Sequence, residues 1–196
     1  MNDAYPVQYD VEYPDRPLNR VTTFFRWILI VPIAIVLGSV SGSFYVASGG
    51  LLLIGPFLMV LFRRKYPRWW FDFNQELLRF SARVSVYGGL MDDRYPSTDE
   101  RQSVRLEIVH PEEGTLNRWL PLVKWLLALP HYVVLLFLGI GASVAVLIAW
   151  FAILFTGRYP RALFDFVVGV YRYAIRVVAY AFVLMTDEYP PFRLAP

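Results

Sequence analysis

Two long stretches of this chain carry no charged side chain, and they constrain the fold more than any other feature. The first covers residues 27–62 and the second residues 125–157, which gives 36 and 33 residues without Asp, Glu, Lys or Arg. A helix that crosses a bilayer needs about 20 mostly apolar residues. Each stretch is therefore too long for one such helix and long enough for two. We predict four transmembrane helices, near residues 19–38, 44–63, 118–138 and 142–157.

Both stretches contain helix-breaking residues close to their midpoints. The first contains GSVSGS at Gly38–Ser43, and the second contains GIG at Gly139–Gly141. Glycine tolerates the backbone conformations of tight turns, so each stretch is expected to fold back as a two-helix hairpin. The composition agrees, because 57% of the residues are hydrophobic and only 18% are charged, against about a quarter charged in soluble domains. The predicted class is a mostly α-helical integral membrane protein.

The distribution of charge predicts the orientation in the membrane. All charged residues lie before, between and after the two uncharged stretches, and neither predicted turn contains one. Because Lys and Arg are retained on the cytoplasmic side, the N-terminus, the middle segment and the C-terminus are all expected in the cytoplasm. Trp27 and Trp125 each follow a basic residue and suit the interface between lipid and water. We therefore expect a multi-pass protein of the cytoplasmic membrane.

The chain also contains the same order of motifs twice. KYPRWWFDF at residues 65–73 returns as RYPRALFDF at residues 158–166. YDVEYPDRPLNR at residues 9–20 is matched by LEIVHPEEGTLNR at residues 106–118. A tandem duplication explains both correspondences.

We predict two repeats, residues 1–97 and residues 98–196. Each repeat is expected to contain a short strand, a transmembrane hairpin and an amphipathic helix that follows the Tyr-Pro-Arg motif. The two strands alternate apolar and polar residues and should pair into a small cytoplasmic sheet. Because both repeats begin and end on one side of the membrane, we expect them to be related by rotation about the membrane normal.

The helix after each Tyr-Pro-Arg motif has one charged side. At 100° per residue, its charged residues fall on one narrow stripe and apolar residues fall opposite. These arginine stripes consist of Arg68, Asp72, Arg79 and Arg83 in the first helix, and of Arg161, Asp165, Arg172 and Arg176 in the second. We expect both helices to lie in the plane of the interface, with the apolar side toward the membrane. The alternative, a fifth and a sixth transmembrane helix, would place arginines in the hydrocarbon at about 2.5–3.5 kcal/mol each.

The arginine stripes are the candidate binding site. Each contains one ion pair at i,i+4 spacing. These predicted pairs are Arg68–Asp72 and Arg161–Asp165. The remaining arginines form like-charged pairs, which predicts an anionic group between them, and lipid phosphate suits guanidinium groups well. The predicted headgroup-binding residues are Arg68, Arg79, Arg83, Arg161, Arg172 and Arg176. The alternatives are bonds to a carboxylate such as Glu76 or to backbone carbonyls, and an ion path.

Two motifs of the second half resemble a known family. GRYPRALFDFVVGVYR at residues 157–172 and TDEYPPF at residues 186–192 are similar to the signature of an uncharacterised prokaryotic membrane protein family, domain of unknown function 4389. Both halves resemble its unit, although the first half has Arg63-Arg64 in place of Thr156-Gly157 and lacks the final PPF. The resemblance implies an integral prokaryotic membrane protein and supplies no activity, cofactor or catalytic residue.

Other chemical sites have little support in the sequence. The chain has no cysteine and two histidines, so thiolate metal sites are excluded and His131 has no second membrane histidine for a haem. Adjacent carboxylates in loops are usually only solvated. Such pairs are Asp92–Asp93, Glu112–Glu113 and Asp187–Glu188. We expect no metal, no cofactor and no nucleic acid partner, and no nucleophile or dinucleotide motif marks an enzyme.

These observations predict a non-catalytic membrane protein. The first hypothesis is a scaffold or accessory subunit of a larger membrane complex, with anionic phospholipid around the arginine stripes and a membrane protein or a second copy of the chain as partner. The second is a membrane-shaping protein, because paired hairpins with in-plane helices can bend a bilayer. The third is a channel or transporter, which the shortage of polar groups in the apolar stretches disfavours.

Overall fold

We describe the protein from a computed structural model of the whole chain. The structure describes residues 5–41, 46–98, 100, 102–112 and 114–196, and the side chains of these except for residues 41 and 46–53. Seven helices and two strands follow one another in this part of the chain. They are β1 (Val7–Val11), α1 (Arg20–Phe24), α2 (Arg26–Ser41), α3 (Val46–Arg63), α4 (Arg68–Gly88), β2 (Val104–Ile108), α5 (Leu120–Leu127), α6 (Leu129–Thr156) and α7 (Arg161–Ala181).

The predicted pairing of the two strands is confirmed. Strands β1 and β2 pair in antiparallel orientation, with Tyr9 opposite Leu106 at the centre of the ladder. Alternate residues of both strands are buried, because side chains of a strand point to opposite faces in turn. The buried residues are Val7, Tyr9 and Val11 in β1 and Val104, Leu106 and Ile108 in β2.

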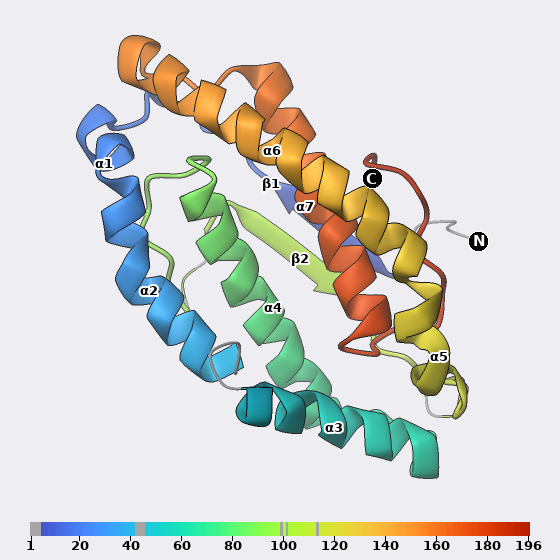
Figure 1. Cartoon of the computed structure of the whole chain (residues 1–196). Coiled ribbons are helices and arrows are strands. Elements are labelled where there is room, and N and C mark those ends of the chain that lie inside the picture. Colours follow the sequence, from blue (N-terminus) through green and yellow to red (C-terminus); the bar gives the residue numbers. More distant parts are fainter. Residues whose placement is uncertain (1–4, 42–45, 99, 101, 113) are drawn as a thin grey trace.

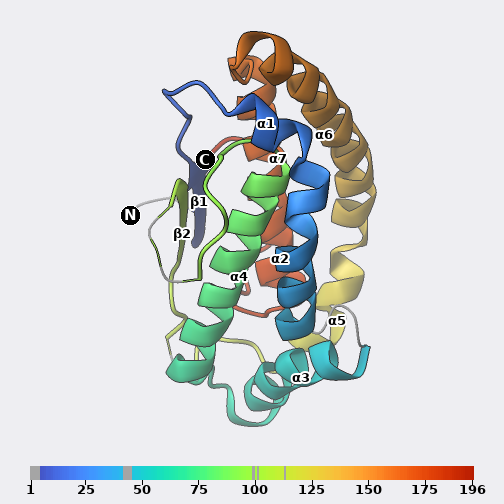
Figure 2. The same cartoon turned by 90° about the vertical axis from the view of Figure 1, so that its left-hand side faces the viewer.

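The elements form three layers (Figure 2). The sheet is one outer layer, helices α4 and α7 form the middle layer, and helices α2 and α6 cover the middle layer on the side away from the sheet. Helix α7, from the second half of the chain, packs under β1 from the first half, and α4 packs under β2. Each middle-layer helix is thus paired with the strand of the other repeat.

The prediction of a hairpin in the second apolar stretch is wrong. Helix α6 runs without interruption from Leu129 to Thr156, through Gly139 and Gly141 (Figure 1). A glycine inside a helix costs only about 1 kcal/mol relative to alanine, and backbone hydrogen bonds of a continuous helix outweigh this. Gly141 lies beside α7, where a Cβ atom would meet the ring of Phe166 at an ordinary contact distance of 3.4 Å.

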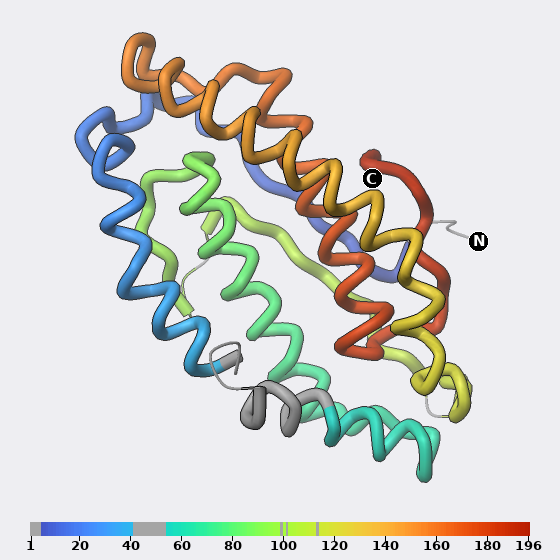
Figure 3. Tube along the Cα trace, in the orientation of Figure 1, coloured from blue at the N-terminus to red at the C-terminus, as the bar shows by residue number. Residues whose placement is uncertain are grey.

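The first apolar stretch does form two helices, but they are not a hairpin. The coloured parts of α2 and α3 run at a wide angle to each other, as the trace in Figure 3 shows. The predicted turn at Gly38–Ser43 is helical up to Ser41, and its last two residues lie outside the described residues. Within the described part of the chain, only α6 is both long and apolar enough to cross a membrane, so four transmembrane helices are not supported.

The helices after the Tyr-Pro-Arg motifs form where predicted, but their location is different. Helices α4 and α7 have 21 residues each and begin directly after Pro67 and Pro160. The apolar side of α7 is buried against α6 instead of facing a membrane, with Val170 and Val177 almost fully enclosed. Neither the in-plane arrangement nor a fifth and sixth span describes them, because α4 packs between α2 and β2 and α7 packs between α6 and β1.

The turn before each middle-layer helix needs a left-handed residue. Gly157 has φ 73° at this position, and Arg64 adopts φ 54° at the equivalent position of the first half. A residue with a Cβ atom pays about 1 kcal/mol for this conformation. We expect Arg64→Gly to raise the free energy of unfolding by about 1 kcal/mol and Gly157→Ala to lower it similarly, as measured by denaturant titration. Equal stability of Arg64→Gly and the wild type would contradict this explanation.

Candidate functional site

The second arginine stripe lies between α7, the sheet and the C-terminal segment. Arg172 donates through Nε to the carbonyl of Tyr9 (2.8 Å) and through one terminal nitrogen to the carbonyl of Leu194 (2.7 Å). Its other terminal nitrogen forms an ion pair with Asp10 at 3.0 Å. One buried guanidinium group therefore ties together helix α7, strand β1 and residues near the C-terminus.

The first stripe makes the equivalent contacts with β2. Arg79 donates to the carbonyl of Leu106 at 2.8 Å and forms an ion pair with Glu76. Leu106 is the register partner of Tyr9, so the two arginines bind equivalent carbonyls at the two opposite edges of the sheet. Two of the alternatives to a lipid phosphate are therefore present: an ion pair with Glu76 and hydrogen bonds to backbone carbonyls.

The two accepting carbonyls point away from the sheet. Glu12 donates its backbone N–H to Ser103 across the ladder at 2.9 Å, which fixes the hydrogen-bonded pairs. Tyr9 and Leu106 lie an odd number of positions from this pair and are therefore a non-hydrogen-bonded pair, with outward-directed peptide groups. The arginines therefore provide a hydrogen bond to one carbonyl on each free edge of the sheet. Unpaired backbone groups at such an edge can otherwise pair with a strand of another chain.

The next arginine of each stripe holds the segment that follows its helix. Arg83 donates to the carbonyl of Ser97 at 2.7 Å, and Arg176 donates to the carbonyl of Ala195 at 3.0 Å. Arg176 is 0% exposed. Burial, together with the nearby charges of Arg172 and Arg193, lowers the pKa of Arg176. Arg83 and Arg176 are thus enclosed by the protein, with backbone oxygens as their acceptors.

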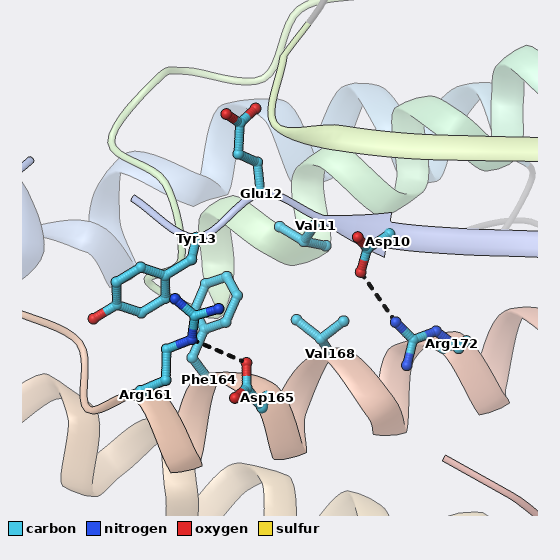
Figure 4. Close-up of a pocket in the computed structure, with 9 residues that line it drawn as sticks. All are labelled: Asp10, Val11, Glu12, Tyr13, Arg161, Phe164, Asp165, Val168 and Arg172. Atoms are coloured by element: carbon cyan, nitrogen blue, oxygen red, sulfur yellow. Dashed lines mark hydrogen bonds and ion pairs between the residues drawn. The ribbon is translucent and has the colours of Figure 1, made fainter. Parts of the chain in front are cut away.

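The first arginine of each stripe remains exposed. Arg161 is 68% exposed, forms the predicted ion pair with Asp165 at 3.7 Å, and stacks over the ring of Tyr13 at 4.5 Å. It borders a pocket of about 350 Å³ between α7 and β1, in which Arg172 and Asp10 form the opposite side (Figure 4). Arg68 is also exposed, but no ion pair joins it to Asp72 among the described residues.

The comparison with known families can now be added to this geometry. The family model described as Domain of unknown function (DUF4389) matches residues 20–98 and 119–193. The chain belongs to this family. It contains two tandem DUF4389 units, as the resemblance of both halves predicted, and both strands of the sheet lie outside the matched residues. No curated protein and no solved structure matches the chain.

Near the end of each DUF4389 unit, an aspartate binds residues that lie near the beginning of the same half of the chain. In the first unit, Asp93 forms an ion pair with Arg26 at 2.7 Å and accepts the backbone N–H of Asn19 at 2.7 Å. We call this arrangement and its counterpart in the second unit the aspartate latches. The second latch consists of Asp187, Lys124 at 2.7 Å and the backbone N–H of Asn117 at 2.6 Å.

Both cations of the aspartate latches are buried against an aromatic ring. Arg26 lies 3.9 Å from the ring centre of Tyr87, and Lys124 lies 5.0 Å from that of Tyr180. Lys124 is 0% exposed and also donates to the carbonyl of Thr186 at 2.7 Å. Burial lowers the pKa of Lys124, while the ion pair with Asp187 opposes this shift. Arg26 and Lys124 directly precede Trp27 and Trp125, the two tryptophans predicted at the interface. Their aspartate partners were not predicted, although D-x-Y-P recurs in both halves.

His131 is a buried packing residue of the second unit. Its Nδ1 atom lies 2.5 Å from the hydroxyl of Tyr173, and its ring stacks on Phe192 at 4.2 Å. Tyr189 adds a third aromatic contact at 4.7 Å. These residues fasten the C-terminal segment to α6 and α7.

No group of three His, Cys, Asp or Glu residues that could hold a metal ion occurs in the described part of the chain. Asp92 accepts hydrogen bonds from Arg94 and Ser103, and although burial alone would raise the pKa of Asp92, these bonds lower it. Asp93 and Asp187 belong to the aspartate latches. Of the remaining pair, Glu113 lies outside the described residues.

Proposed function

We propose that this protein is an integral membrane protein that acts as a non-catalytic scaffold or accessory subunit. The observation that carries the proposal is the outer surface of helices α2, α5 and α6, which is apolar and exposed. Soluble monomers rarely expose apolar patches larger than a few hundred Å². A bilayer would cover this surface.

Helix α6 provides the largest part of the apolar surface. Its 28 residues give a length of about 42 Å, which exceeds the hydrocarbon core of about 30 Å. None of its residues is charged. Large apolar side chains are exposed along it, including Val133, Phe137, Val144, Ile148, Phe151 and Phe155.

The ends of this surface have the residues expected at a membrane boundary. Trp27, Trp119 and Trp125 are exposed beside helices α2 and α5, and tryptophan is enriched at membrane interfaces. Arg158 and Arg161 follow the last residue of α6 and are exposed. Within the arginine stripes, Arg68 and Arg161 are the residues accessible to an anionic headgroup, so we assign the predicted phospholipid contact to these two.

The repeated motif residues support a structural role. The tyrosine of the first Tyr-Pro-Arg motif, Tyr66, donates to the carbonyl of Val183 in the second unit at 3.0 Å. The backbone carbonyl of the second, Tyr159, accepts the hydroxyl of Tyr13 in the first half at 2.6 Å. These motifs are used to join the two halves, which suits a rigid platform that holds membrane partners. A membrane protein or a second copy of this chain would bind the lipid-facing helices.

Cell fractionation tests the proposal. We expect the protein in the membrane fraction, resistant to alkaline carbonate and released by detergent. Ile148→Lys places a charge on the outer surface of α6 at a cost of about 2.5–3.5 kcal/mol in a bilayer, and should lower the membrane-bound fraction at least tenfold. Glu107→Lys, on the exposed face of β2, is the matched control and should leave it unchanged. Recovery of the wild type in the soluble fraction would refute the membrane location, and mild extraction without a stoichiometric partner would refute the accessory role.

A further inference from the structure

The outer layer is divided by a groove. It lies between α2 and α6, and helices α4 and α7 form its floor. Its volume is about 610 Å³, and none of the residues that line it is charged. Trp27 and Ile30 form one wall, and Leu135 and Val146 form the other.

Small residues leave this groove unfilled. Gly139 lies on the α6 wall, and a Cβ atom there would have no other atom within 4 Å. Ala174 contributes only a methyl group to the floor. The space directly beside Gly139 is therefore open.

The groove is elongated. It extends along α6 from Leu135 to Val146, which is about 17 Å at the rise of an α-helix. A slim, extended chain suits a groove of this shape.

The hydroxyl groups of the groove are already used. Tyr171 donates to the carbonyl of Ser85 at 3.2 Å, and Ser143 donates to the carbonyl of Gly139 at 2.8 Å. Ser85 donates to the carbonyl of Ser81 at 2.9 Å. An extended peptide would bring backbone N–H and carbonyl groups into this site without partners, which is costly in an apolar environment. A hydrocarbon chain has no such groups.

We infer that the groove between α2 and α6 binds one acyl chain of a membrane lipid. This inference rests on the proposed membrane location, because the groove opens onto the surface that the bilayer would cover. The bound chain fills the space between the two DUF4389 units and completes the apolar layer over α4 and α7. The protein would then retain one lipid after the surrounding bilayer has been removed by detergent.

Native mass spectrometry of the purified protein in detergent, with added dioleoyl phosphatidylcholine, tests the inference. We expect one retained lipid on the wild type. Gly139→Phe fills the groove and should reduce the lipid-bound fraction at least tenfold. Ile140→Phe is the matched control, since Ile140 is the next residue, faces outward and is 57% exposed; it should retain lipid as the wild type does.

Several outcomes would overturn the inference. Equal lipid retention by Gly139→Phe and Ile140→Phe would place the lipid elsewhere. A wild-type dimer without retained lipid, converted to a monomer by Gly139→Phe, would show that a second copy occupies the groove. Should Gly139→Phe lose its helical circular dichroism, Gly139→Leu provides the same comparison. Failure of the proposed membrane location would appear separately, as wild-type protein in the soluble fraction.

Discussion

The Asp187→Asn variant is expected to unfold with a free energy about 3 kcal/mol lower than the wild type. Asp187 is the counter-ion of Lys124, whose side chain is 0% exposed. Removing one partner of a buried ion pair leaves an uncompensated charge, which costs about 3–5 kcal/mol. We choose the lower end because the side chain of Asp187 keeps 23% exposure. A denaturant titration of the protein in detergent, followed by circular dichroism, measures the change.

Two further variants separate the aspartate latch from a general effect of removing a carboxylate. Asp165→Asn breaks the exposed ion pair with Arg161 and should cost less than about 0.5 kcal/mol. Adding Lys124→Met to Asp187→Asn removes the unpaired buried cation and should recover part of the loss. A loss below 1 kcal/mol for Asp187→Asn, or no recovery in the double variant, would show that the latch contributes little to stability.

The duplication and the local structure could be predicted from the sequence. Alternating residues predicted β1 and β2, and the one-sided arrangement of charges predicted helices after Pro67 and Pro160. These features depend on residues close together in the chain, so periodicity records them. The pairing of each strand with the helix of the other unit could not be derived in this way, because both units have nearly the same strand and the same helix.

The prediction of a two-helix hairpin in each apolar stretch was wrong for a physical reason. Length and lack of charge show that a segment avoids water, but they do not show where it bends. GIG at Gly139–Gly141 permits a turn without requiring one, and a continuous α6 keeps all its backbone hydrogen bonds. Proline would have been stronger evidence, yet α2 and α3 each contain one, at Pro32 and Pro56, without ending there.

The contacts of the stripe arginines also could not be predicted from the sequence. Their like-charged spacing predicted an anionic group between them. Their acceptors in the structure include the backbone carbonyls of Tyr9 and Leu106, which any sequence would provide, so the sequence carries no sign of them. The aspartate latches were more accessible to prediction, because Asp93 and Asp187 recur at equivalent positions, each with a basic residue at the start of an apolar stretch.

Because each strand packs on the helix of the other repeat, we expect that neither half of the chain folds alone. Residues 1–98 contain β1 without α7, and residues 99–196 contain α7 without β1. The contacts of Arg172 with Tyr9 and of Arg79 with Leu106 are lost in either fragment. We expect each half expressed separately to be degraded or aggregated, and the two halves expressed together to co-purify through a tag on one of them.

Moving the division of the chain provides the control. A first fragment of residues 19–112 contains α4 together with β2, the strand that packs on it. Because this fragment keeps the contact of Arg79 with Leu106, we expect its yield in detergent to be at least tenfold higher than that of residues 1–98. Equal yields of the two fragments, or a stable fold of residues 1–98 alone, would show that the strands do not hold the helices of the opposite unit. The duplicated Tyr-Pro-Arg motif would then mark two independent units instead of two interlocked halves.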